Sequence, residues 1–187
     1  MTHYIDIKVL PDPEFPEPQL LSELFGRLHA ALARSSAESV AVAFPGYAER
    51  PPTLGSVMRL LGPASALDQL MSRPWLGGLA DHVAACAIES VPVQATHRML
   101  RRVQAKSSAE RLRRRQIQRH GLSEAEARQR IPNTVEQTLA LPYLVLTSTS
   151  TGQRFRLFLR LDPEPASPRA GDFNAYGLST TATIPVF

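Results

Sequence analysis

A tract of arginines in the middle of the sequence is the feature whose residue types and spacing most directly predict chemistry. Arg111, Arg115 and Arg119 recur at every fourth position, so a helix would place them in one row, with Arg114 beside it. Residues 101–130 hold ten basic side chains against three acidic ones, although the net charge of the whole chain is only +4. Because the planar guanidinium binds phosphates through paired hydrogen bonds, the tract predicts a helix that binds nucleic acid or another polyanion.

The simplest alternative for this tract is a solvated helix. Leu112 and Ile117 are the only large apolar residues between positions 108 and 120. They lie about 140° apart around a helix, so they form no proper buried stripe. Glu110 is the only acidic residue close to the arginines in the sequence. This balance favours a nucleic-acid-binding helix, and composition and spacing alone leave RNA and DNA open as the partner.

The other residue types that carry chemistry show no diagnostic spacing. His29 lies beside the apolar face of a predicted helix, where a histidine is usually a boundary residue, and Ser148 and Tyr176 are by themselves ordinary strand residues. The remaining histidines lack the spacing of metal ligands, and Cys86 is the only cysteine, so no metal site is predicted. The sequence has neither a phosphate-binding loop nor a nucleophile-elbow motif.

Composition indicates a globular protein of one ordinary domain or two small ones. The 187 residues are 43% apolar and 20% charged. The sequence has no apolar run of the roughly 18 residues that a membrane-spanning helix needs. The first residues, MTHYID, lack the basic and apolar regions of a secretion signal, and a lone cysteine suits a reducing compartment. We therefore expect a cytoplasmic protein without a membrane span.

The elements that would position these residues begin with alternating strands and helices. Strands are predicted at residues 4–10, 40–44, 57–61 and 83–91, and helices at 18–33 and 64–71. Ile5, Ile7 and Val9 would share one face of the first strand, and His29 would lie on the first helix. The order βαββαβ predicts an α+β fold. Its N-terminal domain, residues 1–94, would be ferredoxin-like and similar in topology to RRM-type RNA binders.

A second domain is expected over residues 95–187, where charge replaces apolar periodicity. Ser107 with Glu110 and Ser123 with Glu126 have the spacing of helix capping boxes, so two successive helices are predicted, the first carrying the arginines. Strands are predicted after them at residues 143–148, 154–161, 172–177 and 183–187. The second domain would therefore combine an arginine-rich helix with β-hairpins.

Motifs throughout the chain resemble one known family. They include HYIDIKVLPDPEFP, LFGRLH and RPWL in the first half, and RVQAKSSAERLRRRQIQRH, GLSEAEARQRIP, STSTGQRFRLF and a final YGL…PVF in the second. Together they cover essentially the whole length. By these motifs the chain resembles the type I-F CRISPR repeat-processing endoribonucleases of the Csy type, which mature guide RNAs in antiviral defence.

The resemblance implies cleavage of the CRISPR repeat hairpin at its 3′ base without a metal or any other cofactor. A ribose 2′-OH would attack the adjacent phosphate and leave a 2′,3′-cyclic phosphate and a 5′-OH. By position, His29 resembles the general base, Ser148 the residue that holds the reacting nucleotide, and Tyr176 the residue that orients His29. Ser150 and Thr151 would lie beside the scissile group. An imidazole suits this task because it titrates near neutral pH.

The resemblance also implies how the RNA is recognised, with the arginine helix in the major groove of a short stem. Arg102 would pair with a guanine, Gln104 with an adenine, and Phe155 would stack on the terminal base pair. Arg114, Arg115 and Arg119 would contact phosphates of the RNA. The other RNA-binding residues would be Arg111 and Lys106 of the same central tract. Gln118 stands where the family often has another arginine, so one phosphate contact could be weaker.

The expected partners are the CRISPR repeat RNA hairpin and the other subunits of the type I-F surveillance complex, with the free protein a monomer. Two other hypotheses stay open. A catalytically silent subunit would bind the RNA hairpin and would not need His29. A DNA-binding regulator would use the same arginine helix in a B-form groove.

Overall fold

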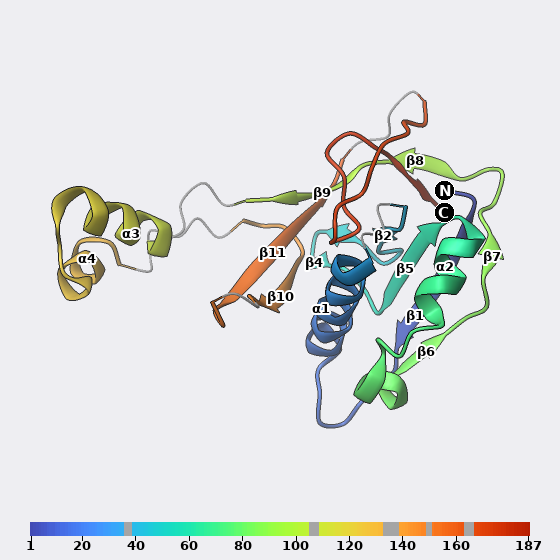
Figure 1. The fold of residues 1–187 in the computed structure, drawn as a ribbon, viewed down its shortest axis with the longest axis horizontal. Helices are drawn as coiled ribbons and strands as arrows, with labels where there is room; N and C mark the ends of the chain where they lie inside the picture. Colours follow the sequence, from blue (N-terminus) through green and yellow to red (C-terminus); the bar gives the residue numbers. More distant parts are fainter. Residues whose placement is uncertain (36–38, 105–108, 133–138, 149–150, 163–166) are drawn as a thin grey trace. The chain divides into compact units, whose positions relative to one another are not determined.

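The structure, a computed structural model, describes residues 1–35, 39–104, 109–132, 139–148, 151–162 and 167–187 (Figure 1). By its contacts the chain divides into two units. The sheet unit comprises Met1–Arg102 and Leu141–Phe187, and the helical unit comprises Val103–Ala140. The sheet unit therefore joins the first half of the chain to its last segment, whereas the sequence-based boundary falls after residue 94. The functional division into two domains at that boundary stays a prediction.

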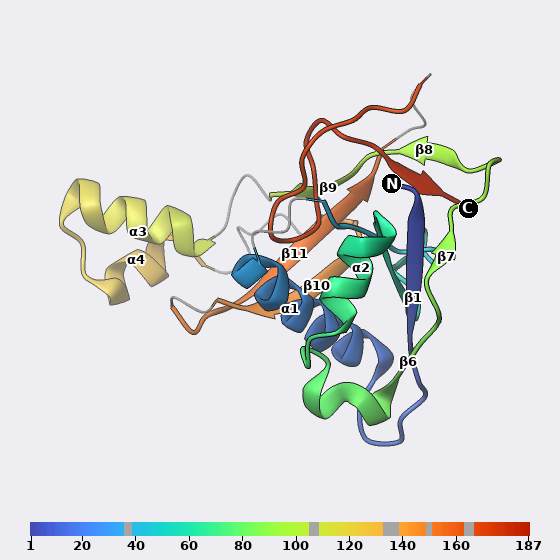
Figure 2. The ribbon, with the colours of Figure 1, turned by 45° about the vertical axis from the view of Figure 1, so that its right-hand side comes forward.

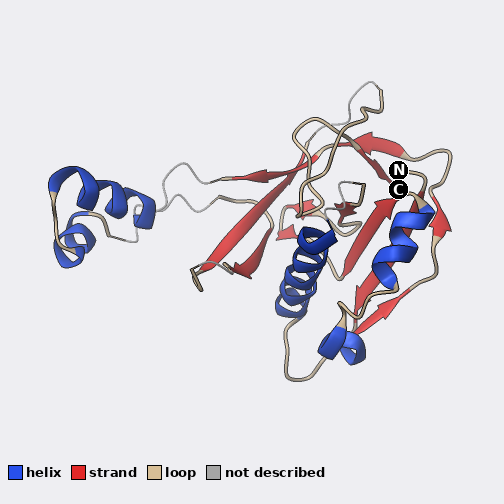
Figure 3. Ribbon diagram, viewed as in Figure 1, coloured by secondary structure: helices blue, strands red, loops and turns tan. Residues whose placement is uncertain are grey.

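The main sheet of the sheet unit is built from the first half of the chain. Its strands are β1 (His3–Val9), β2 (Ala41–Ala43), β5 (Val57–Gly62), β6 (Val83–Ala85) and β7 (Glu89–Ser90). The order is β2-β5-β1-β6 with every neighbouring pair antiparallel, and β7 also pairs with β1. Helix α1 (Glu17–Ser35) follows β1, and α2 (Ala64–Met71) follows β5 (Figure 3). This arrangement confirms the α+β class and has the βαββαβ connectivity of a ferredoxin-like unit.

The core of the sheet unit lies where the apolar periodicity predicts it. Ile5, Ile7 and Val9 of β1 are each 1% exposed or less, so alternate residues of this strand face the core. The apolar face of α1 is buried as its spacing predicts, through Leu21, Phe25, Leu28 and Leu32. Both α1 and α2 contact β1 and β5. His29 is thus carried by a helix that is fixed along its length against the sheet.

Several strand predictions are wrong in detail. The predicted strand 83–91 is interrupted, because Cys86–Ile88 separate β6 from β7. Residues 172–177 form no strand. Short elements outside the predicted set are β3 (Ala48–Glu49), β4 (Pro52–Thr53), the 3₁₀-helix η1 (Gly77–His82), β8 (Thr96–Arg98) and β9 (Leu100–Val103). The predicted strand 183–187 is found as β12 (Ile184–Val186), which pairs with β8 (Figure 2).

A second sheet brings the last segment of the chain against α1. Its strands are β10 (Tyr143–Thr147) and β11 (Arg154–Leu161), both close to their predicted bounds, with β9 beside β11. β10 and β11 are antiparallel, and Thr147 faces Arg154 at the end of the hairpin. Strand β10 packs along α1, where the hydroxyl of Ser22 accepts a hydrogen bond from the Val145 N–H at 3.1 Å.

Replacing Ser22 with alanine is expected to lower the free energy of unfolding by about 1–3 kcal/mol. Ser22 is 7% exposed, and its hydroxyl also donates to the Pro18 carbonyl at 2.7 Å, so it links β10 to α1. Alanine would leave the Val145 N–H without this acceptor. Urea denaturation measures the loss. Ser35→Ala is the matched control, because the Ser35 hydroxyl donates to carbonyls of its own helix. An equal loss in both variants would contradict the role of Ser22.

The helical unit contains two successive helices, as predicted. α3 (Ala109–His120) ends at Gly121, whose φ is +63°, and α4 (Glu124–Arg130) follows it. The capping box of Ser123 and Glu126 is present, and the hydrogen bonds from Ser123 lower the pKa of the Glu126 carboxyl. The other predicted capping residue, Ser107, lies outside the described residues. Among the helices that the structure describes, none is both long and apolar enough to cross a membrane.

Candidate functional site

His29, the predicted general base, is half-buried on α1 and is tied to a distant part of the chain. Its Nδ1 atom lies 2.8 Å from the backbone carbonyl oxygen of Ala175. Because a carbonyl oxygen can only accept a hydrogen bond, Nδ1 carries the proton and donates it. The neutral ring therefore has Nε2 as its basic atom, and Nε2 is the atom that can take a proton from a substrate.

Tyr176, predicted to orient His29, stacks on the same imidazole. The two ring centroids are 3.8 Å apart, and the ring planes differ by 6°. Tyr176 also lies over Phe25, one turn earlier on α1, with ring centroids 6.3 Å apart. The structure thus brings His29 and Tyr176 into contact. This contact with the face of the imidazole restricts the rotation of the ring, while the catalytic roles of both residues stay predictions.

The segment Asn174–Leu178 that carries Tyr176 is closed by its own hydrogen bonds. The side-chain Oδ1 of Asn174 accepts hydrogen bonds from the backbone N–H groups of Tyr176 at 2.9 Å and Leu178 at 3.3 Å. The Gly177 N–H donates to the Asn174 carbonyl at 2.8 Å, and the Asn174 N–H donates to the Leu178 carbonyl at 3.0 Å. The segment forms a turn because these groups are satisfied locally, which explains why the predicted strand is wrong.

Gly177 fixes this turn against the main sheet. Its carbonyl accepts a hydrogen bond from the Val42 N–H of β2 at 3.0 Å. Its φ is +67°, and a Cβ at this position would lie 2.6 Å from Cγ2 of Val42. A glycine is therefore required both by the backbone conformation and by the close approach to β2.

Ser148 and Thr151 lie at the turn of the β10–β11 hairpin. The Ser148 N–H donates to the Gln153 carbonyl at 2.8 Å, and the Ser148 hydroxyl accepts from the Thr151 N–H at 3.3 Å. Strand β10 contacts α1 at two successive residues. Val145 is hydrogen-bonded to Ser22, and Leu146 lies next to Gly26, since a Cβ added at Gly26 would be 3.9 Å from Leu146 Cδ2. The direction along α1 toward His29 is therefore the direction along β10 toward Ser148.

Arg102 and Phe155, the predicted base-pairing and stacking residues, are neighbours in the second sheet. The Arg102 guanidinium carbon lies 5.7 Å from the centroid of the Phe155 ring. Arg102 is exposed, and Phe155 is half-buried. An aromatic face and a planar guanidinium are thus placed together, which is a suitable pair for contacting the end of a base-paired stem.

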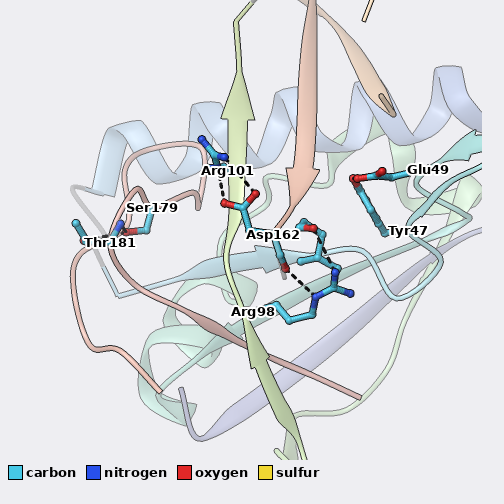
Figure 4. A network of polar contacts seen from close by, with 8 residues as sticks. Tyr47, Glu49, Arg98, Arg101, Asp162, Ser179 and Thr181 are labelled. Carbon is cyan, nitrogen blue, oxygen red and sulfur yellow. Dashed lines mark hydrogen bonds and ion pairs between the residues drawn. The ribbon is translucent and has the colours of Figure 1, made fainter. Parts of the chain in front are cut away.

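Two arginines close to Arg102 in the sequence, Arg101 on β9 and Arg98 on β8, have structural partners, as Figure 4 shows. Arg101 donates from Nε and Nη2 to the carboxylate of Asp162, and these hydrogen bonds raise the pKa of Arg101. Arg98 donates to the carbonyls of Asp162 and Leu161. The ion pair and the carbonyl contacts attach β8 and β9 to the end of β11. Unlike Arg98 and Arg101 in this network, Arg102 has its guanidinium over an aromatic ring.

The arginine row of α3 is exposed where the structure describes it. Arg115 and Arg119 are exposed one turn apart. Arg114 makes a long contact of 3.9 Å with Glu110, and both of these side chains are more than half exposed. Arg113, outside the predicted row, donates to the Ile131 carbonyl at 2.8 Å. The unit is held by α3 packing on α4 around buried Ala109 and Ala127. Gln104 and Gln118 are also exposed.

Lys106 and Ser150 lie outside the described residues, and the side chain of Arg111 is not described, although its backbone belongs to α3. Within the described part of the chain, no group of three or more His, Cys, Asp or Glu side chains could hold a metal ion.

Sequence reasoning missed the partner of His29. The carbonyl of Ala175 is a backbone group, and its residue type carries no signal. The closest signal is the string NAYG, in which Asn174 and Gly177 are residues that favour turns. From that signal a turn could have been predicted in place of the strand. The signal does not indicate that the turn contacts His29.

Known proteins of one family match this chain over essentially its whole length. The family model described as CRISPR-associated protein (Cas_Csy4) matches residues 4–187. A protein named CRISPR-associated endonuclease Cas6/Csy4 from Pseudomonas aeruginosa (strain UCBPP-PA14) is 48% identical over 187 residues, which is 100% of both chains. A protein of the same name from Escherichia coli (strain UTI89 / UPEC) is 40% identical, again over 100% of both chains.

Proposed function

This chain belongs to the Cas_Csy4 family of CRISPR-associated proteins, and from that premise we propose that it is an endoribonuclease that matures guide RNAs. It binds the hairpin of the CRISPR repeat RNA and cleaves at the 3′ base of the stem. The attacking group is the 2′-OH of the nucleotide before the scissile phosphate. The products are a 2′,3′-cyclic phosphate and a 5′-OH, and the reaction uses no metal.

The 2.8 Å contact of His29 Nδ1 with the Ala175 carbonyl is the observation that carries this proposal. With Nδ1 donating to the Ala175 carbonyl, Nε2 is left to accept the 2′-OH proton. The O2′ oxygen then bonds to phosphorus as the bond from phosphorus to the 5′ oxygen breaks. The leaving 5′ oxygen takes up a proton from water and becomes a hydroxyl, and His29 returns its own proton to the solvent, so the proton count is unchanged. Because nucleophile and phosphate belong to one substrate, the protein mainly has to hold them in line.

The other residues of the sheet unit supply this geometry in the proposal. Tyr176 keeps the plane of the His29 ring fixed through the 3.8 Å stacking contact. Ser148 holds the reacting nucleotide from the end of β10, which runs beside α1 in the direction of His29. Thr151 and Ser150 contact the scissile group from the same hairpin.

Recognition of the hairpin uses both units in the proposal. Phe155 stacks on the terminal base pair, and Arg102 beside it pairs with a guanine, as the 5.7 Å placement of the guanidinium supports. Gln104 pairs with an adenine. The phosphates of the stem are bound by the basic residues of the central tract, namely Lys106, Arg111, Arg114, Arg115 and Arg119.

We also propose that the protein works in the cytoplasm, is a monomer when free, and joins the other subunits of a type I-F surveillance complex with its product RNA. The support for this part is the resemblance of the sequence to that family.

A single 2′-deoxy substitution at the nucleotide before the scissile phosphate tests the chemistry. The wild-type protein is mixed with the unmodified or the deoxy hairpin of its repeat, in buffer with EDTA, and cleavage and affinity are both measured. Cleavage is expected only with the unmodified RNA, and the Kd should be the same for both. The reason is that the deoxy RNA lacks the nucleophile but keeps the phosphates and bases that the protein contacts.

Two results would contradict the proposal. Cleavage of the deoxy hairpin would exclude the 2′-OH as nucleophile, and loss of activity in EDTA would indicate a metal. If both RNAs are bound and neither is cleaved, the chain is a catalytically silent hairpin-binding subunit.

A further inference from the structure

The peptide group between Ala175 and Tyr176 is held from both sides. On one side its carbonyl oxygen accepts the hydrogen bond from His29 Nδ1 at 2.8 Å. On the other side its N–H, which belongs to Tyr176, donates to Oδ1 of Asn174 at 2.9 Å. The C=O and N–H of a trans peptide lie in one plane and point in opposite directions. Fixing the direction of the N–H therefore fixes the direction of the carbonyl.

We propose that Asn174 is a positioning residue, whose side-chain oxygen sets the tautomer of His29 by orienting this peptide. The proposal rests on the proposed function for its catalytic consequence, but its structural part concerns the free protein. Without the acceptor on Asn174, the peptide can rotate about its flanking bonds. The Ala175 carbonyl then no longer selects the Nδ1–H form. In a fraction of the molecules the imidazole carries its proton on Nε2, and Nε2 then cannot accept a proton from the substrate.

The turn would keep its place on the sheet when the Asn174 side chain is removed. The carbonyl of Gly177 still accepts from the Val42 N–H at 3.0 Å, and the backbone bond from the Gly177 N–H to the Asn174 carbonyl is still available. Asn174 is itself exposed, so its truncation opens no cavity in the core. The effect is therefore expected at His29 and not in the overall stability.

Three variants separate this role from a general structural one. Asn174→Ala removes the acceptor. Asn174→Asp keeps an oxygen at the same position, so it should restore both hydrogen bonds to the backbone N–H groups. Thr180→Ala is the control, because Thr180 is an exposed residue two positions beyond the segment Asn174–Leu178. Thermal unfolding of all three checks that each is folded.

The first readout is the tautomer of His29 in the protein without RNA. Nitrogen-15 NMR of the imidazole ring distinguishes the Nδ1–H from the Nε2–H form, and comparison with His29→Gln identifies its signals. Wild type, Asn174→Asp and Thr180→Ala should show the Nδ1–H form alone. Asn174→Ala should show a mixture in which Nε2–H is present. An unchanged tautomer in folded Asn174→Ala would overturn the proposal. The proposal would also be overturned if Asn174→Asp showed the same mixture of tautomers as Asn174→Ala.

The second readout is the single-turnover cleavage rate of the repeat hairpin at saturating protein. Asn174→Ala should be slower by about tenfold, because part of the general-base contribution of His29 is lost. Its Kd should be unchanged, and Asn174→Asp should recover the rate. A wild-type rate in Asn174→Ala would overturn the catalytic part. If the wild-type protein cleaves nothing while the tautomer responds as stated, the proposed function fails and the positioning role of Asn174 stands.

Discussion

His29→Ala is expected to lower the single-turnover cleavage rate of the repeat hairpin by about 10²- to 10⁴-fold, with nearly unchanged affinity for the hairpin. The variant removes the Nε2 atom that accepts the 2′-OH proton in the proposed reaction. The hairpin is bound largely through arginines and the Phe155 ring, which this substitution does not touch. The measurement compares cleavage at saturating protein with the Kd from filter binding. The loss is expected to be the largest of any single substitution in the chain.

The matched control is His82→Ala. His82 belongs to the same unit, and its Nδ1 lies 2.9 Å from Asp12 Oδ2, so it is also a half-buried histidine with one ring nitrogen engaged. It has no place in the proposed chemistry, and the cleavage rate should stay at the wild-type value. A His29→Ala protein that cleaves normally but binds the hairpin poorly would show that His29 is a binding residue and not a base.

The parts of the fold that follow from local pattern could be predicted from the sequence. Ile5, Ile7 and Val9 alternate because one face of β1 is buried, and the capping box of Ser123 is satisfied within one helical turn. These signals need no knowledge of distant residues. They were sufficient for the α+β class and for the βαββαβ order of the main strands and helices in the first half of the chain.

The parts that depend on distant residues could not be predicted in the same way. β8 is a strand because residues at the other end of the chain pair with it, such as Ile184 with Arg98. Residues 172–177 alternate like a strand, yet the side chain of Asn174 satisfies their backbone groups in a turn. The pairing of β8 leaves no mark in the local sequence, and the turn is marked only by the turn-favouring residues Asn174 and Gly177.

The candidate site divides along the same line. The arginine row of α3 is visible in the sequence, because i and i+4 residues share a helix face whatever the rest of the chain does. His29 has no such signal, and its role came from the resemblance to a family. What the structure adds is a backbone carbonyl that selects its tautomer, and a carbonyl has no letter in the sequence.

The double variant Arg115→Gln with Arg119→Gln is expected to weaken hairpin binding by roughly ten- to a hundredfold at about 0.15 M salt. The two side chains are exposed one turn apart on α3, and they bind phosphates in the proposed complex. Each phosphate contact that is lost also removes the release of its counterion. The slope of log Kd against log salt concentration should therefore fall by about 1.5 units, which a salt titration of binding measures.

A second double variant shows whether this effect belongs to the row or to charge alone. Arg128→Gln with Arg130→Gln removes the same charge from α4 of the same unit, where Arg128 lies 3.5 Å from Glu124. If α3 lies in the groove of the hairpin, the α4 variant should keep nearly the full affinity and slope, because screening at this salt concentration limits its influence to about 8 Å. Equal losses in the two variants would mean that the RNA responds to the net charge of the unit, and α3 would then not be the element that binds the stem.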